Sequence, residues 1–407
     1  MTDTTPHSPY VVTVNAASWD IWKDTTPLLP SLDVELTERC NNNCIHCCIN
    51  RPEDDAVSHQ ETPTEDLKRI LREAAGLGAL SVRFTGGEPL LHKEFTGLYL
   101  FARGLGLNVV LFTNARCITT EIADLFTRVP PRELIEVTVY GMTKKSYEAV
   151  SRVKGSYEEF RRGVDLLADR KIPFVVKSVF LPQNRGDVIP LEKWASAIPA
   201  MNVGPSHSLL FDLRCRRDSP SNNRRIRSLR LSPEEYISFI SQNRDSYERA
   251  MEMFCSRFMR APGEKIFACG AGLGGCVDAY GMLQPCLMIR HPSTLYDLKK
   301  GSLQDALTRF FPRLREAKSS NPAYLSRCAR CFLKGLCEQC PAKSWMEHGT
   351  LDTPVEYFCE IAHAQARDLG LIFPGENAWE VTDGSLRVMA FSERIYSRTI
   401  KRDSEFK

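Results

Sequence analysis

The chain lacks any run of about 18 apolar residues, the length that a membrane-spanning helix requires. Its N-terminus has no basic stretch followed by an apolar core, so no secretory signal peptide is predicted. Neither sign of charge is in clear excess, because 53 basic and 50 acidic residues leave a net charge of +3. We therefore expect a cytoplasmic protein that neither enters a membrane nor binds nucleic acid through bulk charge.

Cysteine, by contrast, is abundant. Fifteen cysteines in a chain without an export signal favour metal ligation over disulfides. Cys40, Cys44 and Cys47 form a C-x3-C-x2-C pattern in LDVELTERCNNNCIHCCIN, whose first six residues alternate as in a strand. Three thiolates can occupy three corners of a 4Fe–4S cluster and leave one iron open to a ligand. A zinc site would need a fourth ligand, and His46 is too near Cys47 in sequence to serve comfortably.

A second group of eight cysteines lies in the C-terminal half, and these are the candidate metal ligands there: Cys269, Cys276, Cys286, Cys328, Cys331, Cys337, Cys340 and Cys359. Two C-x2-C pairs among them are also typical of zinc sites. The five residues between those pairs are few for a usual two-pair zinc site, and eight thiolates suit two fully ligated 4Fe–4S clusters.

The hydrophobic pattern predicts strands at 32–37, 80–85, 108–112, 135–140, 174–180 and 207–213. Helical periodicity falls between them, at 64–76, 94–104, 120–128, 156–171 and 187–197. Strands that alternate with helices predict an α/β fold, a partial (β/α)6 TIM-like barrel followed by a small Cys-rich iron–sulfur domain. Active sites on such barrels lie at the C-terminal ends of the strands, where the first cysteine loop falls.

We expect five segments: an N-terminal extension (1–30) with one short strand near 10–14, the barrel (31–213), an Arg-rich segment and bridging helix (214–263), the Cys-rich domain (264–370) and a polar, partly mobile tail (371–407). The bridging helix is expected at 232–258. The segment 214–230 holds seven arginines. It is either a solvated linker or a lip over the barrel mouth that binds the carboxylates of a substrate.

The first half resembles the radical S-adenosylmethionine (radical SAM) enzymes, whose signature is C-x3-C-x2-C after the first barrel strand, with an aromatic before the last cysteine. His46 takes that aromatic position, and Gly86-Gly87-Glu88-Pro89 matches the family's GGEP motif. The resemblance implies that Cys40, Cys44 and Cys47 hold the catalytic cluster. It also implies a set of S-adenosylmethionine (AdoMet) contacts: Gly86, Gly87 and Glu88 at the methionine amino group, Thr138 at the ribose, and Asn114 and His46. Ala115 departs from the family's TNG motif.

The Cys-rich region resembles the SPASM extension of these enzymes, with one departure: two residues, not three, separate Cys337 from Cys340. The resemblance implies two auxiliary 4Fe–4S clusters, and three in all. One set of ligands would be Cys269, Cys276, Cys286 and Cys340, and the other Cys328, Cys331, Cys337 and Cys359.

The family implies reductive cleavage of AdoMet to a 5′-deoxyadenosyl radical, which abstracts a substrate hydrogen. A ribosomally made peptide is the expected substrate, for crosslinking, thioether formation or epimerisation. The alternative is a small molecule, such as a tetrapyrrole that undergoes oxidative decarboxylation, and a remote alternative is a non-catalytic electron carrier. Expected partners are an electron donor such as flavodoxin or ferredoxin, and a separate peptide-recognition protein.

Overall fold

The computed structural model describes residues 29–258, 262–337 and 340–405, so the strand expected near 10–14 lies outside the described residues. Six parallel strands form the centre of the molecule. They are β1 (Ser31–Thr37), β4 (Ser81–Gly86), β5 (Asn108–Thr113), β6 (Arg132–Val139), β7 (Phe174–Val179) and β8 (Ser206–Ser208). All six overlap the predicted strands, and the predicted parallel barrel fold is confirmed.

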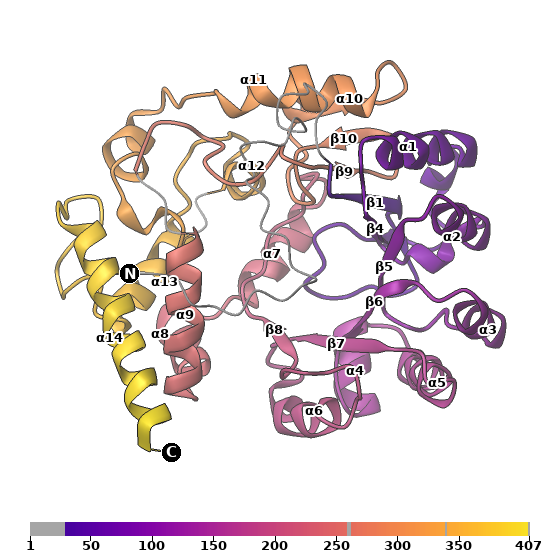
Figure 1. Ribbon diagram of the computed structural model, residues 1–407, viewed down its shortest axis with the longest axis horizontal. Helices are drawn as coiled ribbons and strands as arrows, with labels where there is room; N and C mark the ends of the chain where they lie inside the picture. The colour runs from indigo at the N-terminus through magenta and orange to yellow at the C-terminus, as the bar shows by residue number, and fades with distance from the viewer. Residues whose placement is uncertain (1–28, 259–261, 338–339, 406–407) are drawn as a thin grey trace, which may run out of the picture.

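The helices of the first half cover one face of this sheet (Figure 1). They are α1 (Thr64–Gly76), α2 (Phe95–Gly104), α3 (Thr120–Arg128), α4 (Lys144–Ser151), α5 (Ser156–Asp169) and α6 (Val188–Ala195). Alternation along β1 explains the layering, because Leu32, Val34 and Leu36 enter the apolar core. Asp33 and Glu35 lie on the opposite face of that strand, inside the curve of the sheet.

Strands from the Cys-rich region extend the same sheet. The order is β11-β10-β9-β1-β4-β5-β6-β7-β8, with β9 (Cys276–Val277), β10 (Met282–Gln284) and β11 (Tyr296–Asp297) added at the edge of β1. β9 is parallel to β1, with Cys276 in register with Asp33. The small pair β2 (Arg39–Cys40) and β3 (Arg51–Pro52) frames the first cysteine loop. The barrel and the Cys-rich region are therefore joined through backbone hydrogen bonds.

The rest of the chain is helical and lies beside the barrel and over one end of it (Figure 1). The elements are α7 (Pro220–Ser228), α8 (Pro233–Ile240), α9 (Arg244–Phe258), α10 (Leu303–Asp305), α11 (Phe311–Arg315), α12 (Pro341–His348), α13 (Glu356–Asp368) and α14 (Gly384–Glu405). Within the described residues, no helix is both long and apolar enough to cross a membrane.

One prediction about this region was wrong, and one helix was not predicted. The helix expected at 232–258 is broken after Ile240, because Asn243 caps a new helix by accepting a hydrogen bond from the Ser246 N–H at 3.1 Å. The tail expected to be partly mobile contains the 22-residue helix α14, whose Phe391 and Ile395 pack in an apolar cluster with residues of α9 and α13. Its apolar residues recur at helical spacing, a signal that the prediction overlooked.

Candidate functional site

A cavity of about 320 Å³ opens at the C-terminal ends of the barrel strands. Cys40, Cys44 and Cys47 line it together, and Thr138 and Asn114 face it from β6 and from the end of β5. We call it the barrel cavity. The predicted cysteine loop and the strand-end residues thus meet in one place, as parallel strands require.

The cysteine loop is held by α4, an element that the prediction missed. Asn43 and Ile45 donate backbone hydrogen bonds to the carbonyls of Ser151 and Val150, at 2.9 and 3.1 Å. Arg152, which ends α4 in the left-handed region, donates to the Asn43 carbonyl at 2.7 Å. The helix end therefore supplies carbonyl acceptors that fix the loop between the first two cysteines.

Two of the three cysteine sulfur atoms have a backbone N–H donor nearby. The backbone N–H groups of Asn42 and Asn50 point to the sulfurs of Cys40 and Cys47, both at 3.4 Å. Burial raises the pKa of the Cys44 thiol to about 12, the Cys47 thiol raises it further, and a hydrogen bond with Tyr140 opposes the rise. The thiols are thus protonated without metal, and metal binding must release their protons.

Gly86 and Gly87 allow a close approach of backbone to backbone. A Cβ on Gly86 would overlap the carbonyl oxygen of Thr37, and one on Gly87 would overlap that of Arg39. The Gly87 N–H donates to the Thr37 carbonyl at 2.7 Å. We expected these glycines to admit a ligand, and they also seat the end of β4 against the start of the cysteine loop. Both line the barrel cavity.

Glu88 is fully buried, and its side chain binds protein groups and does not line the barrel cavity. Its carboxylate accepts hydrogen bonds from the Thr113 hydroxyl at 2.9 Å, the Asn114 N–H at 2.8 Å and the Leu90 N–H at 3.2 Å. Burial raises its pKa to about 7, although these donors favour the ionised form. In this structure Glu88 positions the loop after β5.

The other predicted contacts lie at the cavity wall. The Asn114 side chain donates to the Asn41 side chain at 2.8 Å and approaches the Cys40 sulfur at 3.7 Å. His46 packs between Tyr140 and Phe211, with ring centroids 5.9 and 5.3 Å away. Burial lowers the pKa of His46 to about 4, so the ring is neutral. Ala115, the departure from the family motif, has a φ of 63°, a region that favours glycine.

Two basic residues were missed by sequence reasoning. Arg116 is almost completely buried and donates to the Asn41 carbonyl and to the Asn42 side chain, the latter at 2.9 Å, which ties the cysteine loop to the barrel. Lys177, on β7, enters the barrel cavity, pairs with Glu136 and lies 3.8 Å from the centroid of the Phe112 ring. Each is an isolated basic residue in the sequence, so no pattern singled it out.

Three arginines of the Arg-rich segment bind acceptors within the protein, whereas Arg224 and Arg227 are exposed. Arg214 is buried and forms a bidentate pair with Asp218 at 2.8 and 3.0 Å. Arg216 donates to Glu38 at 2.8 Å and to Asp278 at 3.0 Å. Arg217 donates to the carbonyls at the end of α12. Arg216 links the cysteine loop to the Cys-rich region, and Arg217 links the Arg-rich segment to it, because each guanidinium finds an internal acceptor.

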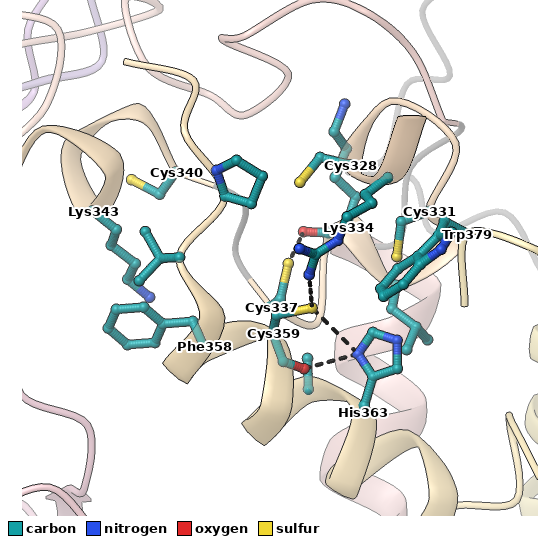
Figure 2. A pocket seen from close by; sticks show the side chains of 15 residues that line it. Cys328, Cys331, Lys334, Cys337, Cys340, Lys343, Phe358, Cys359, His363 and Trp379 are labelled. Atoms are coloured by element: carbon teal, nitrogen blue, oxygen red, sulfur yellow. Dashed lines mark hydrogen bonds between the residues drawn. The ribbon is translucent and has the colours of Figure 1, made fainter. Parts of the chain in front are cut away.

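The C-terminal cysteines divide into two groups. Five cysteines line one pocket, and Figure 2 shows the thiols of Cys328, Cys331, Cys337 and Cys359 gathered together in it, with the Cys340 sulfur to one side. Burial raises the pKa of the Cys331 thiol to about 12, and the Cys359 and Cys328 thiols raise it further. His363 and Arg327 both lie 3.6 Å from the Cys359 sulfur. Four thiols of this chain therefore influence one another electrostatically.

No three Cys, His, Asp or Glu side chains among the described residues converge closely enough to bind a single metal ion. A 4Fe–4S cluster differs from a single ion, because each of its thiolate ligands binds a different iron. Its ligands are therefore spread around a cavity and do not converge on one point. The sulfur donors that line the barrel cavity, and those of Cys328, Cys331, Cys337 and Cys359 around the second pocket, are of the chemical type that such a group requires.

Comparison with known proteins identifies the first half of the chain. Residues 34–195 match the family model described as the radical SAM superfamily. These residues form a radical SAM domain. The match begins within β1 and ends at α6, so the domain includes the cysteine loop and the strand ends that line the barrel cavity.

Relatives of the whole chain are distant. An AdoMet-dependent heme synthase from Methanosarcina barkeri is 22% identical over 340 residues, which are 77% of this chain and 92% of the relative. A PqqA peptide cyclase from Rhizobium meliloti is 27% identical over 173 residues, 42% of this chain and 44% of the relative. The solved structure of native anSMEcpe with bound AdoMet is 14% identical, covers 90% of this chain and 99% of its own, and has a TM-score of 0.57. This last likeness shows a shared fold.

Proposed function

We propose that this chain is a radical SAM enzyme that cleaves AdoMet reductively and abstracts a hydrogen atom from a substrate. The observation that carries the proposal is the barrel cavity, where Cys40, Cys44 and Cys47 share one wall with the glycines of the GGEP motif. When bound there, a 4Fe–4S cluster would supply the electron that cleaves AdoMet to a 5′-deoxyadenosyl radical. The protein would orient the two reactants and exclude water from them.

The site residues would have two kinds of role, ligation of the cluster and positioning of the cofactor. The three thiolates would bind iron, while the Asn42 and Asn50 N–H groups would donate to two of the sulfurs. Thr138, Asn114 and the backbone of Gly86 and Gly87 would contact AdoMet. Glu88 would act through the Asn114 loop that it holds. His46, neutral and packed between aromatic rings, would form a wall of the cofactor site.

The proposal includes two auxiliary clusters in the Cys-rich region, for three 4Fe–4S clusters in all. The gathering of Cys328, Cys331, Cys337 and Cys359 around one pocket supports the first set (Figure 2). The separate position of Cys340 supports its place in the second. An electron donor such as flavodoxin or ferredoxin would reduce the catalytic cluster. We keep the proposed segments 1–30, 31–213, 214–263, 264–370 and 371–407, with β9–β11 of the fourth extending the sheet of the second.

We propose a peptide as the substrate, with a separate protein to recognise it. Structural neighbours include anSMEcpe bound to the Cp18Cys peptide, with a TM-score of 0.55, and Streptococcus suis SuiB bound to the precursor peptide SuiA, with a TM-score of 0.50. The main ground for a carboxylate-rich substrate was the Arg-rich segment. Arg214, Arg216 and Arg217 use their guanidinium groups within the protein, so they offer no ready clamp for propionates.

The second candidate is a tetrapyrrole or another small molecule, and the extent of the heme synthase match favours it. Mass spectrometry distinguishes the two. Incubation with AdoMet, dithionite and a carboxylated tetrapyrrole should leave the tetrapyrrole unchanged, whereas a peptide substrate should lose hydrogen or gain a crosslink. Loss of carbon dioxide from the tetrapyrrole would establish the second candidate.

The proposed activity is tested by the triple change Cys40→Ala, Cys44→Ala, Cys47→Ala in anaerobically reconstituted protein. The wild type should hold about twelve irons and release 5′-deoxyadenosine, and the variant should hold about four fewer and release none. Continued release of 5′-deoxyadenosine would refute the proposal. A matched control is Cys331→Ala, which should lose product formation but still release some 5′-deoxyadenosine under strong reduction.

A further inference from the structure

Cys215 belongs to neither proposed ligand set, yet both halves of the molecule hold it in place. It is fully buried just after the barrel. Its N–H donates to the carbonyl of Cys48 in the cysteine loop at 3.0 Å. Its own carbonyl accepts a hydrogen bond from the Trp345 indole, on α12, at 2.9 Å. Since α12 begins directly after Cys340, these contacts fix Cys215 against the element that carries Cys340.

The side chain of Cys215 lies among other thiols. It is part of an apolar cluster against which Cys286, Cys340 and Cys48 also pack. Burial raises the pKa of the Cys286 thiol, and the nearby Cys269 and Cys215 thiols raise it further. The Cys340 thiol is in turn affected by Cys286. Cys215, Cys286 and Cys340 therefore meet at one apolar cluster, and Cys269 lies near Cys286.

Cys276 is the fourth ligand that the family resemblance implies, and its surroundings are different. It lies on β9, in register with Asp33 of β1 and opposite Gln284 of β10. Unlike Cys215, it is not a member of the apolar cluster against which Cys286 and Cys340 pack. Its neighbours are therefore those of the sheet edge rather than the other proposed ligands.

We propose that Cys215, rather than Cys276, completes the second auxiliary cluster together with Cys269, Cys286 and Cys340. The inference rests on the proposed function and names a different ligand for one of its clusters. Cys215 would release its thiol proton as its sulfur binds iron. The hydrogen bond between the Cys48 and Cys215 thiols would then be donated by Cys48 to the ligating sulfur. Cys48 directly follows Cys47, so this hydrogen bond would join the proposed ligand Cys215 to the neighbour in sequence of a catalytic-cluster ligand.

The test uses the full chain, reconstituted anaerobically, with iron and sulfide counted per chain. Cys215→Ala should lose about four of about twelve irons, whereas Cys276→Ala should retain them all. Cys255→Ala is the matched control, because Cys255 is a buried cysteine in a different apolar cluster, and it should also retain all irons. Circular dichroism checks that each variant is folded.

Cys215→Ser keeps the proposal testable if the alanine variant does not fold. An oxygen ligand should keep the cluster but shift the electron paramagnetic resonance signal of one reduced auxiliary cluster, while Cys276→Ser should leave every signal in place. The proposal is overturned if Cys276→Ala or Cys48→Ala loses the four irons and Cys215→Ala does not. A Cys48–Cys215 disulfide in the anaerobic protein, or a wild type with only about four irons, would also overturn it. Failure of the proposed activity is separate, because it is read from 5′-deoxyadenosine release by the Cys40, Cys44, Cys47 variant.

Discussion

Arg290 donates two hydrogen bonds from one nitrogen to the two carboxylate oxygens of Glu35, at 2.6 and 2.8 Å, in a fully buried site. The pair joins the Cys-rich region to the inner face of β1. A second nitrogen of Arg290 lies 3.1 Å from Glu38, at the start of the cysteine loop. Tyr280, from the turn between β9 and β10, donates to the other oxygen of Glu38 at 2.9 Å. The cysteine loop thus begins on a buried ionic network that the C-terminal half completes.

Removal of Arg290 should therefore destabilise the whole protein. Arg290→Met leaves the buried Glu35 carboxylate without its partner, which typically costs about 3–5 kcal/mol. Urea unfolding followed by circular dichroism measures the loss. The control is Arg309→Met, since Arg309 forms an exposed pair with Asp305 and should change stability by less than about 1 kcal/mol. Equal effects of the two substitutions would contradict the role given to the buried pair.

Gly163, within α5, should not tolerate a methyl group. A Cβ there would overlap the carbonyl oxygen of Ala115, in the loop that Glu88 and Asn114 also hold. Alanine normally stabilises a helix by up to about 1 kcal/mol relative to glycine. We expect Gly163→Ala instead to destabilise the protein by about 2 kcal/mol or more, because a backbone atom must move.

Gly97→Ala on α2 is the matched control, since a Cβ there meets only the side chain of Glu94, at 3.7 Å. It should raise the melting temperature slightly. If both alanine variants stabilise the protein, the close contact of α5 with the Ala115 loop is not essential.

Gly163 and Gly97 both lie in helices, and the sequence alone does not show which of them has a close neighbour. The six strands and the helices at Thr64–Gly76 and Thr120–Arg128 follow from periodicity, because each pattern reports one buried face. The cysteine loop and the GGEP motif could be found because their chemistry constrains the spacing. The partners of Gly87 and Glu88 could not be predicted, since Thr37 and Asn114 reach them only through the way in which the strands meet in space.

The arginines illustrate the same limit. Their number in 214–230 was visible, but whether a guanidinium faces solvent, substrate or protein depends on acceptors far along the chain. The partners of Arg216, for example, are Glu38 and Asp278. Arg116 and Arg290 belong to no sequence motif. Their roles are visible only in the structure, where they bind residues that are distant in sequence.

Glu88 predicts a pH dependence of stability. Its pKa is raised by burial from 4.5 to about 7, so between these values the folded protein keeps a proton that the unfolded chain releases. Stability should therefore fall as the pH rises through this window, by up to about 3 kcal/mol from this group. Glu88→Gln should remove that part of the slope in urea unfolding of the metal-free chain. Glu65→Gln, at an exposed position on α1, should not. Parallel curves for the wild type and Glu88→Gln would contradict the prediction.

Arg116 should control how firmly the catalytic cluster is retained. Its guanidinium binds the Asn41 carbonyl and the Asn42 side chain on one side and Glu159 of α5 on the other, at 2.8 Å. Arg116→Gln removes most of these bonds and leaves the loop between Cys40 and Cys44 free to open. Losing about 2 kcal/mol of such contacts would make opening roughly 30-fold more frequent.

Chelator challenge of the reconstituted protein measures that opening. One cluster of the proposed three should release its iron roughly 30-fold faster in Arg116→Gln, and the other two at the wild-type rate, because the partners of the Arg116 side chain lie within the barrel. Arg161→Gln is the control, since Arg161 lies on α5, the helix that carries Glu159, and pairs with Asp165 at 3.3 Å on the exposed surface. It should release iron as the wild type does. Uniformly faster loss from all clusters would mean that Arg116 supports the fold as a whole and not the cysteine loop in particular.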